Sequence, residues 1–152
     1  MLAWSDYGAG VQQSGDGAGP HLGDDLGPAD EQLVRIETRR ITHANSEALV
    51  VMVAGEIDLH TVHRLRTAVA AGFDQLSDGQ MLVIDLTEVT FLSSEGLAAL
   101  VDVTQTAQLR REPLPVVVDH TRPVIRPIEI TGLDDVLALF NTLEDALQAP
   151  SQ

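Results

Sequence analysis

Residues 83–101, VIDLTEVTFLSSEGLAALV, change from the periodicity of a strand to that of a helix within a few residues. The apolar run at residues 81–86 predicts a strand that is covered on both faces. Three apolar residues then recur at the spacing of a helix: Leu97, Leu100 and Val101. The polar residues 90–96 are expected to form the loop between strand and helix. Such a loop presents hydroxyl groups and free backbone N–H groups at the positive end of a helix, where functional groups are common.

Composition limits the classes of function. The chain has 152 residues and a formal net charge of −14, and its nine basic residues are all arginine. We expect no nucleic-acid partner, because phosphate backbones are recognised by clustered positive charge. No apolar run approaches the ~20 residues that span a bilayer, and the chain does not start like a signal peptide. A cytoplasmic protein without a membrane partner is therefore expected.

Residues 1–30 differ in composition from the rest of the chain. They are rich in Gly, Asp, Gln and Ala and contain no arginine or lysine. Such a segment cannot bury enough apolar area to offset its ordering entropy, so it predicts a disordered acidic tail. Trp4 and Tyr7 could anchor a partner, although the simpler expectation is that they contact nothing. Residues 31–149 are then the folded domain, which is of ordinary single-domain size.

The folded part begins with two strands, at residues 33–41 and 48–54, which form a hairpin. A helix is expected at residues 59–72, with Asp58 or Thr61 as its cap. The later elements are a strand at 81–86, a helix from Ser94 to Arg110, a strand at 114–118, an irregular helical turn before Gly132, a strand at 136–140 and a helix ending near Leu147. This alternation predicts an α/β fold with a mostly parallel sheet and right-handed crossovers.

Two motifs in this alternation carry a resemblance to a known family. Gly55-Glu56-Ile57-Asp58 leads into the first helix, and residues 85–97, DLTEVTFLSSEGL, lead into the second. Together they resemble the STAS domain of bacterial anti-sigma factor antagonists, over about residues 33–149. The resemblance implies a STAS-like mixed, mostly parallel sheet of four to five strands, with helices packed mainly on one face.

The same resemblance implies a transcription regulator that binds a partner and is not an enzyme. The partner is an anti-sigma factor, often a serine kinase that phosphorylates the loop before the central helix, and a phosphatase reverses the modification. No cofactor is expected. The alternative is a STAS-like scaffold or transport-associated subunit that is never phosphorylated.

The loop of this chain departs from the usual Asp-Ser-Ser/Thr-Gly of the family. Aligned on Gly96, the acidic position falls on Ser93, the first hydroxyl on Ser94 and the second on Glu95. The resemblance therefore implies phosphorylation at Ser94, with Ser93 as the alternative. The Glu95 carboxylate would imitate a phosphate only in part, since phosphoserine carries about −1.5 to −2 charges. Ordinary capping of the helix is the competing explanation for both serines.

The expected partner surface joins the two motifs. Capping is again an alternative role for Asp58. The residues carried over from the family are Glu56, Asp58, Ser93, Ser94, Glu95, Gly96 and Leu97.

Two other constellations are weaker. His60 and His63 are three residues apart, but no further ligands lie nearby in the sequence, so no metal site is expected. Ser94, His120 and Asp119 superficially offer a nucleophile, a base and an orienting carboxylate, in that order. The serine lies in Ser-Ser-Glu-Gly, however, and not in the Gly-x-Ser-x-Gly turn of hydrolases, so no catalytic residue is expected.

Overall fold

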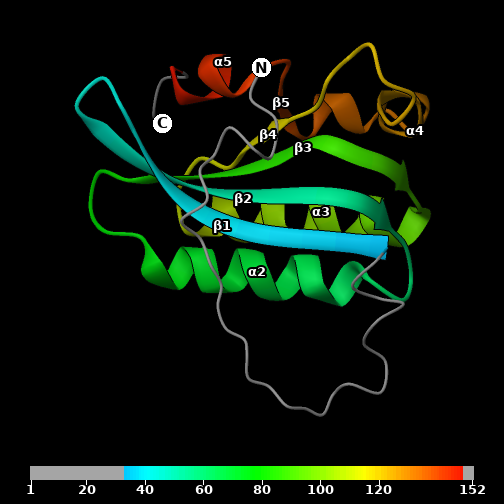
Figure 1. Cartoon of the computed structure of the whole chain (residues 1–152), viewed down its shortest axis with the longest axis horizontal. Coiled ribbons are helices and arrows are strands. Elements are labelled where there is room, and N and C mark those ends of the chain that lie inside the picture. The colour runs from blue at the N-terminus through cyan, green and yellow to red at the C-terminus, as the bar shows by residue number, and fades with distance from the viewer. Residues whose placement is uncertain (1–32, 149–152) are drawn as a thin grey trace.

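A computed structural model describes residues 33–148, which form one mixed sheet with helices on both faces (Figure 1). The strands lie in the order β1-β2-β3-β4-β5. β1 is antiparallel to β2, and every later pair is parallel. Their bounds are β1 Val34–His43, β2 Ser46–Ile57, β3 Met81–Leu92, β4 Pro115–Val117 and β5 Ala138–Phe140. The predicted α/β class and the mostly parallel sheet are confirmed.

Helices cover the two faces of the sheet unequally. The helical elements are α2 Val62–Gln75, α3 Ser94–Leu109, α4 Ile125–Ile130, the 3-10 helix η4 Leu133–Asp135 and α5 Leu143–Leu147. Apolar residues of α2, α3 and α4 join one large core cluster, whereas α5 packs against a smaller cluster on the opposite face. Figure 1 shows α2 below the sheet and α5 above it, with α3 behind β1 and β2 in this view. The expectation that helices pack mainly on one face is confirmed.

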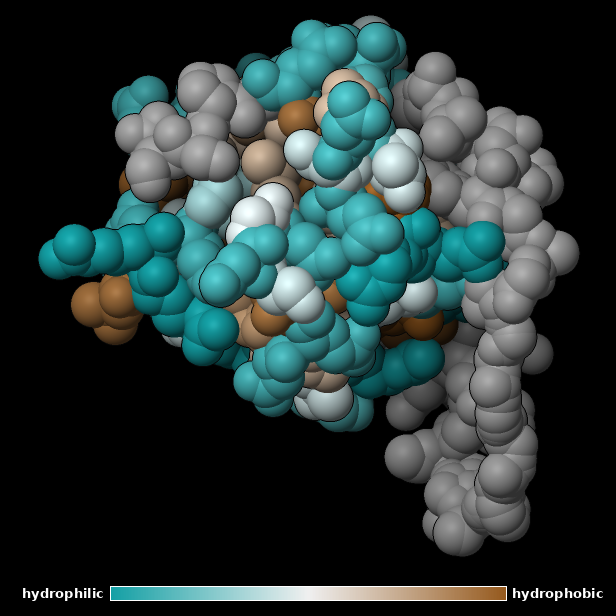
Figure 2. Space-filling view, turned by 90° about the vertical axis from the view of Figure 1, so that its left-hand side faces the viewer, coloured by the Kyte–Doolittle hydropathy of each residue, from teal (hydrophilic) through white to brown (hydrophobic). Residues whose placement is uncertain are grey.

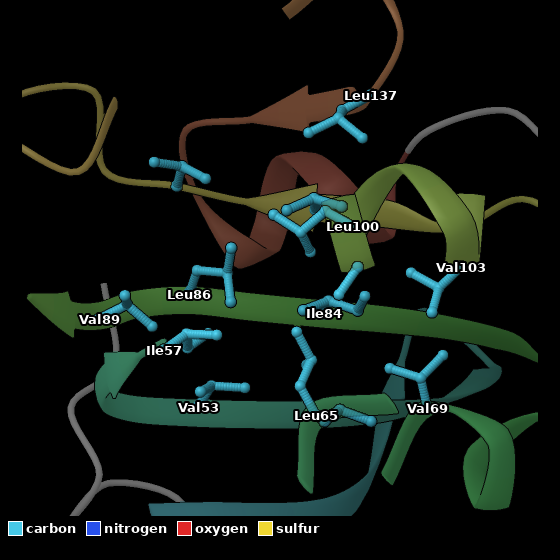
Figure 3. Close-up of a cluster of buried hydrophobic side chains, with 14 of the residues drawn as sticks. Val53, Ile57, Leu65, Val69, Ile84, Leu86, Val89, Leu100, Val103 and Leu137 are labelled. Carbon is cyan, nitrogen blue, oxygen red and sulfur yellow. The ribbon is translucent and has the colours of Figure 1, made fainter. Parts of the chain in front are cut away.

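The central strands are apolar throughout because both of their faces are buried. In β2, Val51 and Val53 belong to the large cluster, while Val50 and Met52 face the smaller one, as the two-residue period of a strand requires. Figure 3 shows the large cluster, in which side chains of the sheet meet those of α2 and α3.

The hairpin between β1 and β2 closes through a two-residue turn. Ala44 and Asn45 have φ angles of 51° and 71°, between the paired residues His43 and Ser46. Two successive positive φ angles are those of a type I′ turn, whose twist matches that of the strands it joins.

Strand β3 extends well beyond the predicted end at residue 86. Two register shifts against β2, between Met52 and Ala54 and between Gly55 and Glu56, mark bulges in the pairing. At the first, the Asp85 carboxylate accepts hydrogen bonds from the Thr87 N–H and hydroxyl, at 2.9 and 2.8 Å. The polar stretch that predicted a loop from residue 90 is therefore strand as far as Leu92, and the loop proper is short.

Some expectations lie outside the described residues, namely the tail at residues 1–30 and the environments of Trp4 and Tyr7. Within residues 33–148, no helix is both long enough and apolar enough to cross a membrane.

Candidate functional site

Three polar turns follow the neighbouring parallel strands β2, β3 and β4. Residues 58–61 connect β2 to α2, residues 93–96 form the cap and first turn of α3 directly after β3, and residues 119–121 follow β4. Parallel strands end at the same edge of a sheet, so all three turns lie at this edge, where α/β proteins commonly bind their ligands.

The turn after β2 is held by its own side chains. A carboxylate oxygen of Asp58 accepts hydrogen bonds from the N–H groups of His60 and Thr61, at 2.9 and 3.1 Å. The buried Thr61 hydroxyl accepts from the Asp58 N–H at 3.0 Å and donates to the Glu56 carbonyl at 2.9 Å. Thr61 is the N-cap residue of α2, yet its hydroxyl bonds back to the strand and makes no capping bond into the helix. The helix consequently begins at Val62 and not at the predicted Leu59.

Ser93 is the N-cap of α3. Its hydroxyl accepts a hydrogen bond from the Gly96 N–H at 3.3 Å. The Ser93 N–H donates to the Ile57 carbonyl at 2.9 Å, which ties the turn after β3 to the end of β2. Capping, the alternative considered for both serines, accounts for Ser93.

Ser94 differs from its neighbour. It is the first residue of α3, its side chain is exposed, and its hydroxyl makes no hydrogen bond to any residue in the described part of the chain. Glu95 lies half-buried in the first turn, where a negative charge is favourable with the helix dipole by about 0.3–1 kcal/mol. A hydroxyl and a carboxylate are therefore presented side by side at the start of α3.

Gly96 and Leu97 lie beneath this surface. A Cβ atom on Gly96 would stand 2.6 Å from Cδ1 of Leu92 and 3.0 Å from Cγ2 of Ile57, so glycine lets α3 approach the strand ends closely. The Leu97 side chain is buried in the large core cluster. Both residues position the loop and offer little of their own side chains to a partner.

Glu56 is half-buried at the end of β2 and pairs with Phe91 of β3. The Phe91 side chain is 50% exposed, and that of Leu59, in the neighbouring turn, is 64% exposed. Sequence reasoning did not include these two residues in the site. The available signal was that Phe91 is the single aromatic residue of the polar segment 90–96.

The Asp119 turn has its own hydrogen bonds. A carboxylate oxygen of Asp119 accepts from the hydroxyl and the N–H of Thr121, at 2.7 and 2.9 Å. These two bonds hold the pKa of Asp119 below its ordinary value. The N–H of His120 donates to the Asn141 side chain, so this segment is anchored as a turn. Among residues 33–148, no group of three or more His, Cys, Asp or Glu side chains could hold a metal ion, and His60 and His63 are both exposed.

Most residues of the three turns are at least partly exposed. Two cavities, of about 540 and 370 Å³, lie near the amino ends of the strands, and the residues of the three turns line neither. The end of the molecule opposite the three turns, which carries the β1–β2 turn, is mostly hydrophilic (Figure 2). An exposed set of turns suits a macromolecular partner better than an enclosed small ligand.

Comparison with known proteins identifies relatives of most of the folded part. The family model described as the STAS domain matches residues 36–146. The anti-sigma-B factor antagonist of Listeria monocytogenes is 33% identical over 101 residues, which cover 66% of this chain and 86% of that protein. The anti-sigma-F factor antagonist RsfB of Mycobacterium tuberculosis is 36% identical over 108 residues, covering 70% and 85%. The crystal structure of an anti-sigma factor antagonist from Mycobacterium paratuberculosis matches with a TM-score of 0.61 and 37% identity, covering 74% of this chain and 92% of that one.

Proposed function

The chain belongs to the STAS domain family, and from this premise we propose that it is an anti-sigma factor antagonist. The antagonists of this family are binding proteins and not enzymes. In this proposal the domain at residues 31–149 binds an anti-sigma factor in the cytoplasm and so frees a sigma factor for transcription, while the tail at residues 1–30 is not needed for folding. The binding surface combines the turns after β2 and β3.

We propose further that the anti-sigma factor is a serine kinase and that Ser94 is its substrate. The observation that carries this proposal is the difference between two adjacent serines. The Ser93 hydroxyl is engaged in capping α3, whereas the Ser94 hydroxyl is exposed and free of other described residues. Phosphate on Ser94 would sit at the amino end of a helix, where its charge is favourable. The fold would therefore tolerate the modification.

Phosphate on Ser94 would lower the affinity for the anti-sigma factor. A partner surface that fits a neutral hydroxyl would have to desolvate a group of about −1.5 to −2 charges, at a cost to the affinity. Glu95 already places one negative charge beside Ser94. The partner must accept that charge, so the switch is shallower than in a relative with a second hydroxyl at this position. A phosphatase that restores the hydroxyl would restore binding.

The test is a phosphorylation assay. The full chain is incubated with magnesium ATP and each purified serine-kinase anti-sigma factor of its source organism, and the modified residue is located by mass spectrometry. We expect phosphate on Ser94, loss of the modification in Ser94→Ala and its retention in Ser93→Ala. Phosphate on Ser93 would show that the capping serine is the acceptor. Binding without any phosphate transfer would favour the unphosphorylated scaffold.

A further inference from the structure

Two large apolar side chains are exposed beside the polar turns of the proposed surface. Leu59 follows Asp58 directly, and Phe91 lies near the end of β3. Their side chains are 64% and 50% exposed, whereas the neighbouring Ile57 and Leu92 are buried in the core. Exposed apolar side chains are ordinary when they are scattered singly, but two beside one functional loop suggest an interaction surface.

The backbone brings the two residues to the same end of the paired strands β2 and β3. Phe91 pairs with Glu56 across the two strands, and Ile57 pairs with Leu92. The hydrogen bond from the Ser93 N–H to the Ile57 carbonyl then links the residue after β3 to the end of β2. Leu59 therefore lies two residues after one end of this link and Phe91 two residues before the other, close to the loop that carries Ser94.

The two segments that carry the pair are acidic. The segments 54–60 and 87–97 together carry four carboxylates and neither arginine nor lysine: Glu56, Asp58, Glu88 and Glu95. An apolar centre with a charged border is the usual composition of a protein interface. The matching partner surface has an apolar recess with cationic side chains facing Glu56 and Asp58, while the part that faces Ser94 fits a neutral hydroxyl.

We propose that Phe91, together with Leu59, anchors this chain to its anti-sigma factor by inserting into an apolar recess that carries arginine or lysine on the side of Glu56 and Asp58. This inference rests on the proposed function and adds the residues that supply the affinity. Aromatic side chains dominate many interfaces, because they bury a large area at little cost in conformational entropy. An anchored Phe91 also keeps water away from the adjacent loop. A charge added at Ser94 would then have to be desolvated on binding.

The experiment measures the affinity of the full chain, by isothermal titration, for the anti-sigma factor that it binds in the assay above. The variants are Phe91→Ala, Phe91→Thr and Leu59→Ala, and Phe91→Thr keeps a residue that favours a strand. The matched control is Leu109→Ala, which also removes an exposed leucine, 86% exposed, at the distant end of α3. Thermal unfolding of every variant checks that the fold is kept.

We expect both Phe91 variants to bind about tenfold more weakly or worse, Leu59→Ala about threefold more weakly and Leu109→Ala within about twofold of the unmodified chain. Losses in the Phe91 variants with an unchanged thermal midpoint support the anchor. If the unmodified chain binds and the Phe91 variants bind equally well, the anchor is wrong and the proposed function stands. If the unmodified chain binds no anti-sigma factor, both proposals fall.

Discussion

The turns after β2 and β3 begin at the same edge of the sheet and open neighbouring helices, but their hydrogen bonds differ. Side-chain oxygens of Asp58 and Thr61 make several bonds to the backbone within the turn after β2. The turn after β3 has one such bond, from the Gly96 N–H to the Ser93 hydroxyl at 3.3 Å. Ser94 makes none within the described residues.

The difference shows that similar polar residues at helix starts serve two purposes. The Asp58 and Thr61 side chains are occupied in holding the backbone, so their replacement should cost stability. Ser94 holds nothing, so its replacement should leave the fold intact and act on the partner. The three predictions below test this division, from the largest expected effect to the smallest.

Thr61→Val should break the turn after β2. Valine has nearly the same shape, but it removes the hydroxyl that bonds to the Asp58 N–H and the Glu56 carbonyl. Thr61 is 1% exposed, so water does not readily replace the hydroxyl as a partner for the Asp58 N–H and the Glu56 carbonyl. We expect the free energy of unfolding, measured with denaturant, to fall by about 1–3 kcal/mol. Thr90→Val is the control, because the exposed Thr90 makes one bond of 3.3 Å, to the Gly55 carbonyl. Equal losses of stability in the two variants would show that the Thr61 hydroxyl contributes no more than an exposed threonine hydroxyl.

Ser94→Asp should leave stability unchanged and weaken binding to the anti-sigma factor about tenfold, or about 1.4 kcal/mol. The cause is the desolvation of a second carboxylate beside Glu95. Ser94→Asn is the matched control, since asparagine has the shape of aspartate without its charge. Glu95→Ser should preserve or tighten binding because it removes the charge already present. Titration of the three variants against one partner decides the matter, and equal affinity for Ser94→Asp and the unmodified chain would rule out the phosphoswitch.

The smallest predicted effect is a difference in the free energy of unfolding between alanine replacements of the two serines. Ser93→Ala removes the cap of α3 and should cost about 0.5–1 kcal/mol, at the lower end for a cap because its bond is long. Ser94→Ala should change the free energy of unfolding by no more than about 0.5 kcal/mol, as is usual for a surface substitution. Denaturant unfolding of both variants under one set of conditions gives the comparison. A similar loss in both would mean that Ser94 also supports the helix start.

The sequence could predict the elements and the place of the candidate site because both depend on local patterns. Strand and helix periodicities alternate clearly, and the polar residues that end β2 and β3 are adjacent in the chain to the helices they precede. Ser93 was correctly considered as a cap for the same reason: a cap needs a side-chain oxygen one residue before the helix.

The length of β3 could not be predicted from the same patterns. Residues 87–91 are mixed in polarity, and they become strand because they pair with β2 through bulges. That pairing joins residues that are distant in the chain. The exposed position of Phe91 follows from the same pairing, whereas the local pattern predicts a loop at this residue and gives no reason to include it in the surface. The start of α2 was missed because Asp58 and Thr61 bond within their turn and not into the helix.

The strands of this sheet lie side by side in the order in which they occur in the chain. Each strand therefore pairs with the one synthesised just before it, across a connection short enough to close at modest entropic cost. As the chain leaves the ribosome, the sheet can grow in one direction, from β1 towards β5. The turns at residues 58–61 and 93–96 need only β2, β3 and the first turn of α3. All residues of the surface proposed to bind the partner thus precede β4 and β5 in the chain.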